Sequence, residues 1–227
     1  MTGVKQLALD LRHRPALGME DFLVAECNRE AVAWIDRWPH WPAPALTVFG
    51  PAGCGKTHLA HVWQACSRAV IVAPDALAGA EPPALLAGAR CCVVEELDMG
   101  LDPASERAML HLYNTVAERG GHVLLTARRP PSRWNVALAD LASRLGAAPA
   151  VAVGRPDDAL IAALLVKLFA DRQLAVSEEV IAYLLPRMER SFDGARRLVA
   201  GIDRAALASR RRVTVALIRE VLAGEGT

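Results

Sequence analysis

Short apolar runs alternate with longer stretches of helical periodicity over the first two thirds of the chain. The runs are rich in β-branched residues and are bounded by glycine, proline or charge, which is typical of buried strands. They cover residues 46–49, 69–73, 91–94, 123–126 and 150–153. Because parallel strands need crossover connections, this alternation predicts an α/β fold with one five-stranded parallel sheet flanked by helices.

The pattern changes after residue 155, where only helical periodicity remains. We predict four helices over residues 157–172, 178–188, 194–210 and 214–223, with Ser177 and Thr214 as N-caps of the second and fourth. Residues 1–21 are polar and carry Pro15 and Gly18, so they indicate an extended tail. We therefore expect a tail over 1–21, an α/β domain over 22–154 and a small all-helical domain over 155–227.

Composition narrows the class of protein. The 227 residues carry 26 basic and 25 acidic side chains and are 53% apolar, which excludes a disordered chain and a generally basic nucleic-acid binder. The longest apolar stretch, 159–166, is too short to span a membrane, and the polar N-terminus does not resemble a secretory signal. Five cysteines without a C-x-x-C pair indicate neither a disulfide framework nor a zinc site. We expect a cytoplasmic protein.

One segment carries a phosphate-binding pattern directly after the first predicted sheet strand and at the start of a helix. It fits G-x-x-x-x-G-K-[ST] and consists of Gly50, Pro51, Ala52, Gly53, Cys54, Gly55, Lys56 and Thr57. Glycines let backbone amides turn toward a phosphate, and the helix N-terminus adds partial positive charge. Lys56 is expected to neutralise the outer phosphates of ADP or ATP, and Thr57 to offer a hydroxyl to Mg²⁺. Cys54 is interpreted as a small loop residue, with a redox-sensitive position as the alternative.

Two acids follow the predicted strand 91–94. Glu95 stands at the position expected to hold the metal, where aspartate is usual, and Glu96 at the position that polarises the attacking water. Asp98 could assist them or be an exposed loop acid. Thr126 ends the next strand, where such folds place a polar residue near the γ-phosphate, although it also fits an ordinary strand end.

Several stretches resemble a known family. Phe22, Asn28 and Ala31, followed by Gly-Lys-Thr-His-Leu-x-His over 55–61, resemble the DnaA-type branch of the AAA+ ATPases. Asp-Leu-Ala-Ser-Arg-Leu over 140–145 and Ile-Asp-Arg-Ala over 202–205 resemble the Hda family of DnaA-related regulators more closely. The resemblance covers roughly residues 5–223. It implies a P-loop AAA+ core followed by a helical lid.

The resemblance also implies roles for single residues. Val24 and Asn28 would line the adenine pocket, and His58 belongs to the nucleotide-binding motif. Arg144 would be the arginine finger delivered to the nucleotide of a neighbouring subunit, unless it forms only a surface salt bridge on a helix over 136–145. Arg196 is the candidate lid arginine that contacts the bound phosphates, with Arg197 as the alternative. Arg128 stands where DnaA proteins tend to place an acid.

The tail contains a second pattern that the family explains. Gln6, Leu7, Leu9 and Leu11 resemble the hexapeptide by which bacterial replication proteins dock onto the β sliding clamp of DNA polymerase III. Such a peptide inserts a glutamine amide and leucines into preformed pockets. Alternating leucines alone equally describe an edge strand.

The resemblance implies a regulatory inactivator of the initiator DnaA, with DnaA and the clamp as partners. Such a protein binds ADP or ATP, presents Arg144 to DnaA-bound ATP and so prevents re-initiation, with weak or no intrinsic ATPase of its own. The alternative is a self-assembling motor or helicase loader that hydrolyses ATP with Lys56, Glu96 and Arg144, and a third is a P-loop scaffold. Sequence-specific origin binding is not expected, because the chain ends after the lid; a non-specific DNA contact and a homo-oligomer stay open. No membrane partner is expected.

Overall fold

The computed structural model describes residues 13–14, 22–99 and 101–224. The clamp-docking pattern over residues 6–11 lies outside these residues. The described residues form two compact units, one of 26–155 and one of 13–14, 22–25 and 156–224. Each unit is described by itself.

The larger unit is built on a five-stranded parallel sheet with the strand order β4-β5-β6-β3-β7. Its strands are β3 (Ala45–Phe49), β4 (Val70–Val72), β5 (Cys92–Val94), β6 (Val123–Ala127) and β7 (Ala150–Ala152). Its helices are α1 (Arg29–Asp36), α2 (Lys56–Ser67), α3 (Pro82–Leu86), α4 (Pro103–Glu118) and α5 (Ala139–Ala147), with short 3-10 turns η1 (Pro74–Gly79), η2 (Leu97–Met99) and η3 (Pro131–Arg133). The predicted parallel α/β sheet is confirmed.

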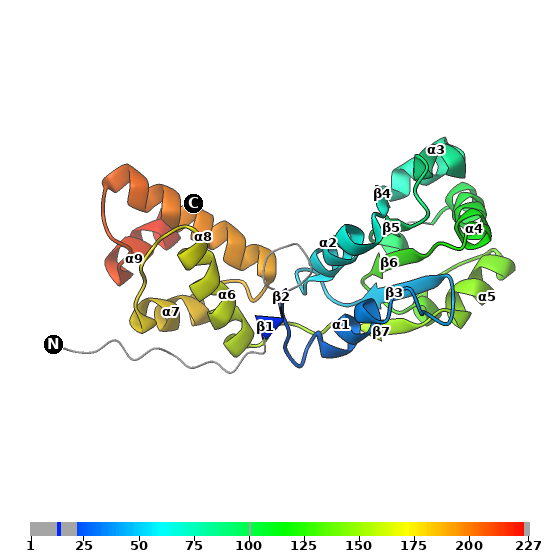
Figure 1. Ribbon diagram of the computed structural model, residues 1–227. Helices are drawn as coiled ribbons and strands as arrows, with labels where there is room; N and C mark the ends of the chain where they lie inside the picture. Colours follow the sequence, from blue (N-terminus) through cyan, green and yellow to red (C-terminus); the bar gives the residue numbers. More distant parts are fainter. Residues whose placement is uncertain (1–12, 15–21, 100, 225–227) are drawn as a thin grey trace. The chain divides into compact units, whose positions relative to one another are not determined.

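Helices cover both faces of the sheet. Figure 1 shows α1 and α2 on one side of it and α3, α4 and α5 on the other. On the second side, Met109 and Leu112 of α4 and Leu141 of α5 pack in one buried cluster with Val94 and Leu125 of the strands. Because both faces are covered, the strands read as continuous apolar runs instead of alternating ones.

The sheet topology fixes where chemistry can occur. All five strands point the same way, so the loops after β3, β5 and β6 lie at one edge of the sheet. β3 pairs with β6 in a register that places Phe49 opposite Ala127, immediately before the two loops begin. Residues about 30 and 80 positions apart in sequence therefore meet at this edge.

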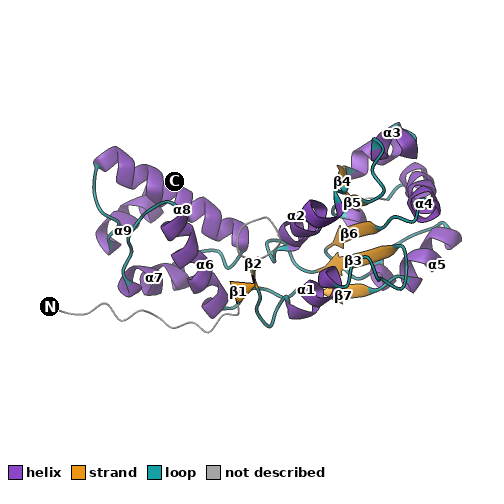
Figure 2. Cartoon of the chain, in the orientation of Figure 1, coloured by secondary structure: helices purple, strands orange, loops and turns teal. Residues whose placement is uncertain are grey.

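The smaller unit is helical apart from two short strands, β1 (His13–Arg14) and β2 (Phe22–Leu23), which pair antiparallel. Its helices are α6 (Asp158–Asp171), α7 (Glu178–Leu184), α8 (Phe192–Ser209) and α9 (Val215–Gly224), and η4 (Leu185–Arg187) follows α7 (Figure 2). Asp157 caps α6 by accepting a hydrogen bond from the Leu160 backbone amide at 2.7 Å.

Apolar burial holds the four helices together. Leu165 and Phe169 of α6, together with Val199 and Ile202 of α8, are fully buried. Thr214 accepts a 3.4 Å hydrogen bond from the Leu217 amide as the expected cap of α9. Ser177 takes the N-cap position of α7 without a side-chain capping bond.

Candidate functional site

The loop between β3 and α2 has a backbone that only glycine accommodates at several positions. Gly53 and Gly55 have φ values of 72° and 101°, in the left-handed region that side chains disfavour. At Gly50, an added Cβ would overlap the carbonyl oxygen of Val153, just beyond the end of β7. The loop therefore curls tightly at the N-terminus of α2, which is the geometry that offers backbone amides to a phosphate.

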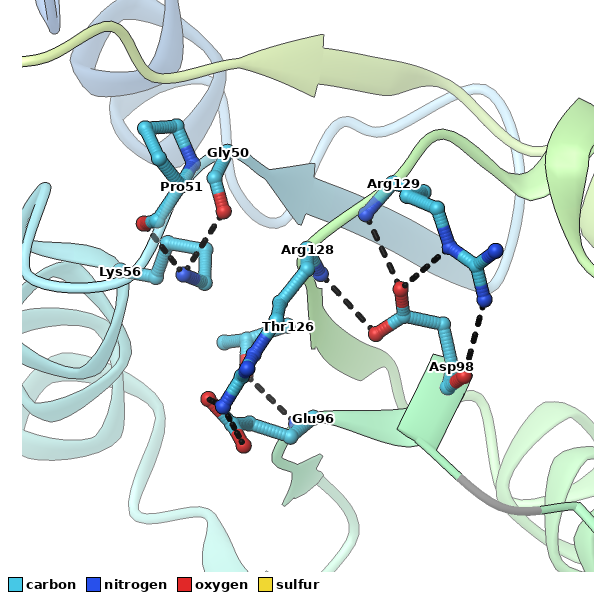
Figure 3. Close-up of polar contacts among 8 residues, drawn as sticks. All are labelled: Gly50, Pro51, Lys56, Glu96, Asp98, Thr126, Arg128 and Arg129. Carbon is cyan, nitrogen blue, oxygen red and sulfur yellow. Dashed lines mark hydrogen bonds and ion pairs between the residues drawn. The ribbon is translucent and has the colours of Figure 1, made fainter.

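Lys56 carries an unneutralised charge inside this loop. Its side chain is buried, and Nζ donates hydrogen bonds to the carbonyl oxygens of Gly50 and Pro51, both at 3.0 Å (Figure 3). No ion pair of Lys56 occurs among the described residues. A buried cation with only neutral acceptors is poorly compensated, so the loop is prepared to receive an anion.

Cys54 packs within the loop. Its thiol is buried, and desolvation raises its pKa above the usual value, although the Lys56 charge opposes the shift. The thiol is therefore protonated near neutral pH. This environment agrees with the interpretation of Cys54 as a small loop residue.

The residues expected to hold Mg²⁺ present suitable oxygen donors. Oε1 of Glu95 is buried and has no hydrogen-bond partner among the described residues, so it is free to accept a ligand. Thr57 is exposed in the first turn of α2 and can direct its hydroxyl to the same ion. No cluster of three or more His, Cys, Asp or Glu side chains that could hold a metal occurs in the described part of the chain. Carboxylate and hydroxyl oxygens fit Mg²⁺, which also takes phosphate and water ligands.

Glu96 and Thr126 lie side by side at the ends of β5 and β6. The Glu96 backbone amide donates to Oγ1 of Thr126 at 3.0 Å, and the Thr126 side chain is buried. Glu96 has φ of 49°, an uncommon value for a residue with a side chain. The Glu96 carboxylate also contacts Nη2 of Arg128, at 3.4 Å through Oε1 and 3.2 Å through Oε2 (Figure 3).

Asp98 binds the backbone at the start of the loop after β6. Its side chain is fully buried, and its two carboxylate oxygens accept the backbone amides of Arg128 at 2.9 Å and Arg129 at 3.0 Å. Both oxygens are therefore occupied by the start of the loop after β6. Asp98 fixes the place from which the Arg128 side chain begins.

Arg144 lies on the surface of α5. Its guanidinium pairs with Asp140 one turn earlier at 3.2 Å and lies over the Tyr113 ring, 5.7 Å from its centroid. The expected alternative, a salt bridge along the helix, is thus present in the isolated chain. Exposed pairs of this kind are worth about 0–1 kcal/mol, so the guanidinium is easily released to another anion.

Helix α5 begins three residues later than its sequence pattern indicates. Glu106 of α4 is buried, and its carboxylate accepts the backbone amides of Ala137 at 2.9 Å and Leu138 at 2.7 Å. These bonds hold the chain extended just before Ala139. The prediction that the helix starts at residue 136 is wrong for this reason. Sequence reasoning did not find Glu106; a lone acid on the apolar face of α4 was the available signal.

The remaining candidate residues fall in different parts of the two units. Asn28 is buried at the N-terminus of α1, and His58 lies in the first turn of α2, both in the larger unit. Val24 belongs to the smaller unit. Arg196 and Arg197 are exposed on α8; Arg197 pairs with Glu189 at 2.8 Å, whereas Arg196 makes no ion pair among the described residues.

Similarity to known proteins agrees with this architecture. Residues 157–222 match the family described as Hda, lid domain. Domain III of DnaA from Thermotoga maritima has a TM-score of 0.75 at 14% identity, covering 89% of this chain and 94% of that one. AMPPCP-bound DnaA from Aquifex aeolicus has a TM-score of 0.65 at 18% identity, covering 79% and 62%. DnaA bound to AMPPCP and single-stranded DNA has a TM-score of 0.66 at 17% identity, covering 83% and 66%.

A parallel sheet with a P loop after β3, acids after β5 and a separate helical unit give this chain the fold of AAA+ ATPase domains. The chain spans less than two thirds of the length of the two AMPPCP-bound DnaA chains. The family match is confined to the helical unit: residues 157–222 match the Hda lid domain. No helix in the described residues is both long and apolar enough to cross a membrane.

Proposed function

We propose that this chain is a cytoplasmic regulatory inactivator of DnaA that stimulates hydrolysis of DnaA-bound ATP. The observation that carries the proposal is an Hda-type lid on a DnaA-type AAA+ fold. An adaptor of this kind needs a nucleotide site of its own, a clamp-docking segment and an arginine that reaches its partner's nucleotide. The chain supplies a candidate for each.

The nucleotide site is proposed at the P loop. ADP or ATP would place its phosphates over the loop amides and the Lys56 ammonium, and Mg²⁺ would take oxygen ligands from Thr57 and Glu95. When bound, Mg²⁺ neutralises charge on the phosphate oxygens. We assign Asn28 and Val24 to binding of the adenine base. His58, in the first turn of α2, is assigned to the part of the nucleotide site next to the phosphates. Arg196 is the candidate lid arginine, and Arg197, which pairs with Glu189 at 2.8 Å, is the alternative.

The arginine finger is proposed at Arg144. The Arg144 side chain is 39% exposed, and its guanidinium is restrained by an exposed pair with Asp140 and a contact with the Tyr113 ring. A delocalised, permanently charged fork can stabilise phosphoryl charge in a neighbouring site. Residues 6–11 would bring this arginine to DnaA by docking on the DNA-loaded β clamp, so that initiation is switched off after replication begins.

The test measures ATP hydrolysis by purified DnaA with this chain added, with and without the DNA-loaded clamp. We expect stimulation that depends on the clamp and is lost in a Gln6→Ala/Leu7→Ala double variant. Arg144→Ala should abolish stimulation and keep clamp binding, whereas the exposed Arg133→Ala should leave stimulation intact. Lys56→Ala should lose nucleotide binding.

Other outcomes would identify the alternatives. ATP-dependent oligomers with steady turnover by the chain alone, and no effect on DnaA, would indicate a self-assembling motor. Loss of thermal stability in Lys56→Ala with unchanged DnaA stimulation would indicate that nucleotide serves only as a scaffold.

A further inference from the structure

The ion pair between Glu96 and Arg128 joins the residue expected to polarise water to a cation from the same chain. One guanidinium nitrogen, Nη2, lies 3.4 Å from Oε1 and 3.2 Å from Oε2 of the carboxylate. Figure 3 shows the Arg128 side chain running past Thr126 to reach it. The pair therefore lies at the sheet edge where a terminal phosphate is proposed to bind.

Backbone contacts hold both ends of this pair in place. The Arg128 amide is bound by the buried Asp98 carboxylate at 2.9 Å, and the Glu96 amide is bound by Thr126 Oγ1 at 3.0 Å. The two side chains therefore start from fixed points just after the ends of the adjacent strands β5 and β6. Because their backbones are already held, these two side chains lose less conformational freedom on pairing than an arginine and an acid on mobile loops would lose.

The contact opposes the chemistry expected of Glu96. In hydrolysis of a bound triphosphate, the water oxygen bonds to the terminal phosphorus while the bond to the bridging oxygen breaks. A proton of that water passes to the Glu96 carboxylate. A guanidinium that contacts both carboxylate oxygens, at 3.4 and 3.2 Å, occupies the atoms to which this water would donate its proton.

We infer that Arg128 restrains Glu96 and suppresses hydrolysis of the triphosphate bound by this chain itself. Arg128 is a positioning residue, and the inference rests on the proposed nucleotide site. The restraint lets the chain keep its nucleotide while Arg144 acts on the partner. Because the side chains are 44% and 46% exposed, the pair is worth no more than about 1 kcal/mol, and its effect on rate is modest.

The experiment measures steady-state ATP hydrolysis by the purified full chain with Mg²⁺ and without DnaA. The variants are Arg128→Ala, Arg128→Lys, Glu96→Gln and the double variant Arg128→Ala/Glu96→Gln. Arg133→Ala removes an exposed arginine five residues further on and serves as the matched control. Binding of a fluorescent ATP analogue is measured for every variant.

We expect Arg128→Ala to raise kcat about two- to fivefold with KM unchanged, since the substrate contacts remain. Arg128→Lys should restore most of the suppression, because an ammonium can still pair with the carboxylate. The gain should vanish in the double variant, and Arg133→Ala should match the unmodified chain.

Three results would overturn the inference while leaving the nucleotide site intact. They are an unchanged or lower kcat in Arg128→Ala with normal ATP binding, a gain that persists without the Glu96 carboxylate, and an equal gain in Arg133→Ala. Failure of the unmodified chain to bind the ATP analogue would overturn the proposed function first, and the inference with it. Binding thus separates the two failures.

Discussion

Two neighbouring parts of the sheet edge are built in different ways. The P loop is one continuous segment whose shape comes from glycine backbone conformation, with Gly53 and Gly55 at positive φ. The acid–arginine cluster, consisting of Glu96, Asp98, Thr126 and Arg128, comes from two strands about 30 residues apart and is joined by side-chain to backbone hydrogen bonds. The first is set by local sequence, whereas the second exists only after β5 and β6 pair.

This comparison predicts that the effect of a substitution in the P loop on stability depends mainly on backbone crowding. Gly50→Ala would force its Cβ against the Val153 carbonyl, so the backbone must move, and we expect the free energy of unfolding to fall by about 3 kcal/mol. Gly146→Ala, in α5 with open space around its Cβ, should be neutral or stabilising by about 0.5–1 kcal/mol. Urea unfolding followed by circular dichroism measures both. Equal stability of the two variants would contradict the crowding.

In the cluster, the largest loss is expected at Asp98. Asp98→Ala removes the acceptor of two backbone amides and should cost about 2 kcal/mol of unfolding free energy. Asp98→Asn keeps one acceptor oxygen and should cost less. The exposed Asp75→Ala serves as a control and should change little. If Asp98→Ala unfolds at the same urea concentration as the unmodified chain, Asp98 does not anchor this loop.

Cysteine labelling tests how tightly the P loop is closed, by comparing the reactivity of Cys54 in the loop with that of the exposed Cys66. Burial raises the pKa of the Cys54 thiol, so less thiolate is present at pH 8 than for an exposed cysteine. Iodoacetamide should modify Cys54 about tenfold or more slowly than the exposed Cys66, as followed by peptide mass spectrometry. In urea the two rates should converge. Fast labelling of Cys54 in the folded chain would show that the loop is open.

The smallest effect is expected at Thr126. Thr126→Val leaves the Glu96 amide without its acceptor and should lower the free energy of unfolding by about 1 kcal/mol, while Thr126→Ser retains the hydroxyl. The difference between the two variants isolates the hydrogen bond from general packing. A serine variant as unstable as the valine variant would assign the loss to the missing methyl group instead.

Much of the fold follows from local pattern. The five apolar runs became the five strands within about two residues, because parallel strands buried on both faces need continuous apolar sequence. The ends of some helices differ from the bounds that the local pattern predicted. α7 ends at Leu184 before a 3-10 turn that contains Pro186, and α5 starts late because Glu106 binds the amides before it.

By itself, the sequence determined the sheet, the P loop and the positions of Lys56 and Glu96, because each depends on residues close together in the chain. Only the tertiary structure decided what Arg128, Asp98 and Glu106 do. Their partners lie about 30 residues away, and charged side chains of this kind are equally suited to solvent until packing brings an acceptor or donor within reach. Long-range pairing of polar groups depends on strand register and helix placement, which local periodicity does not specify.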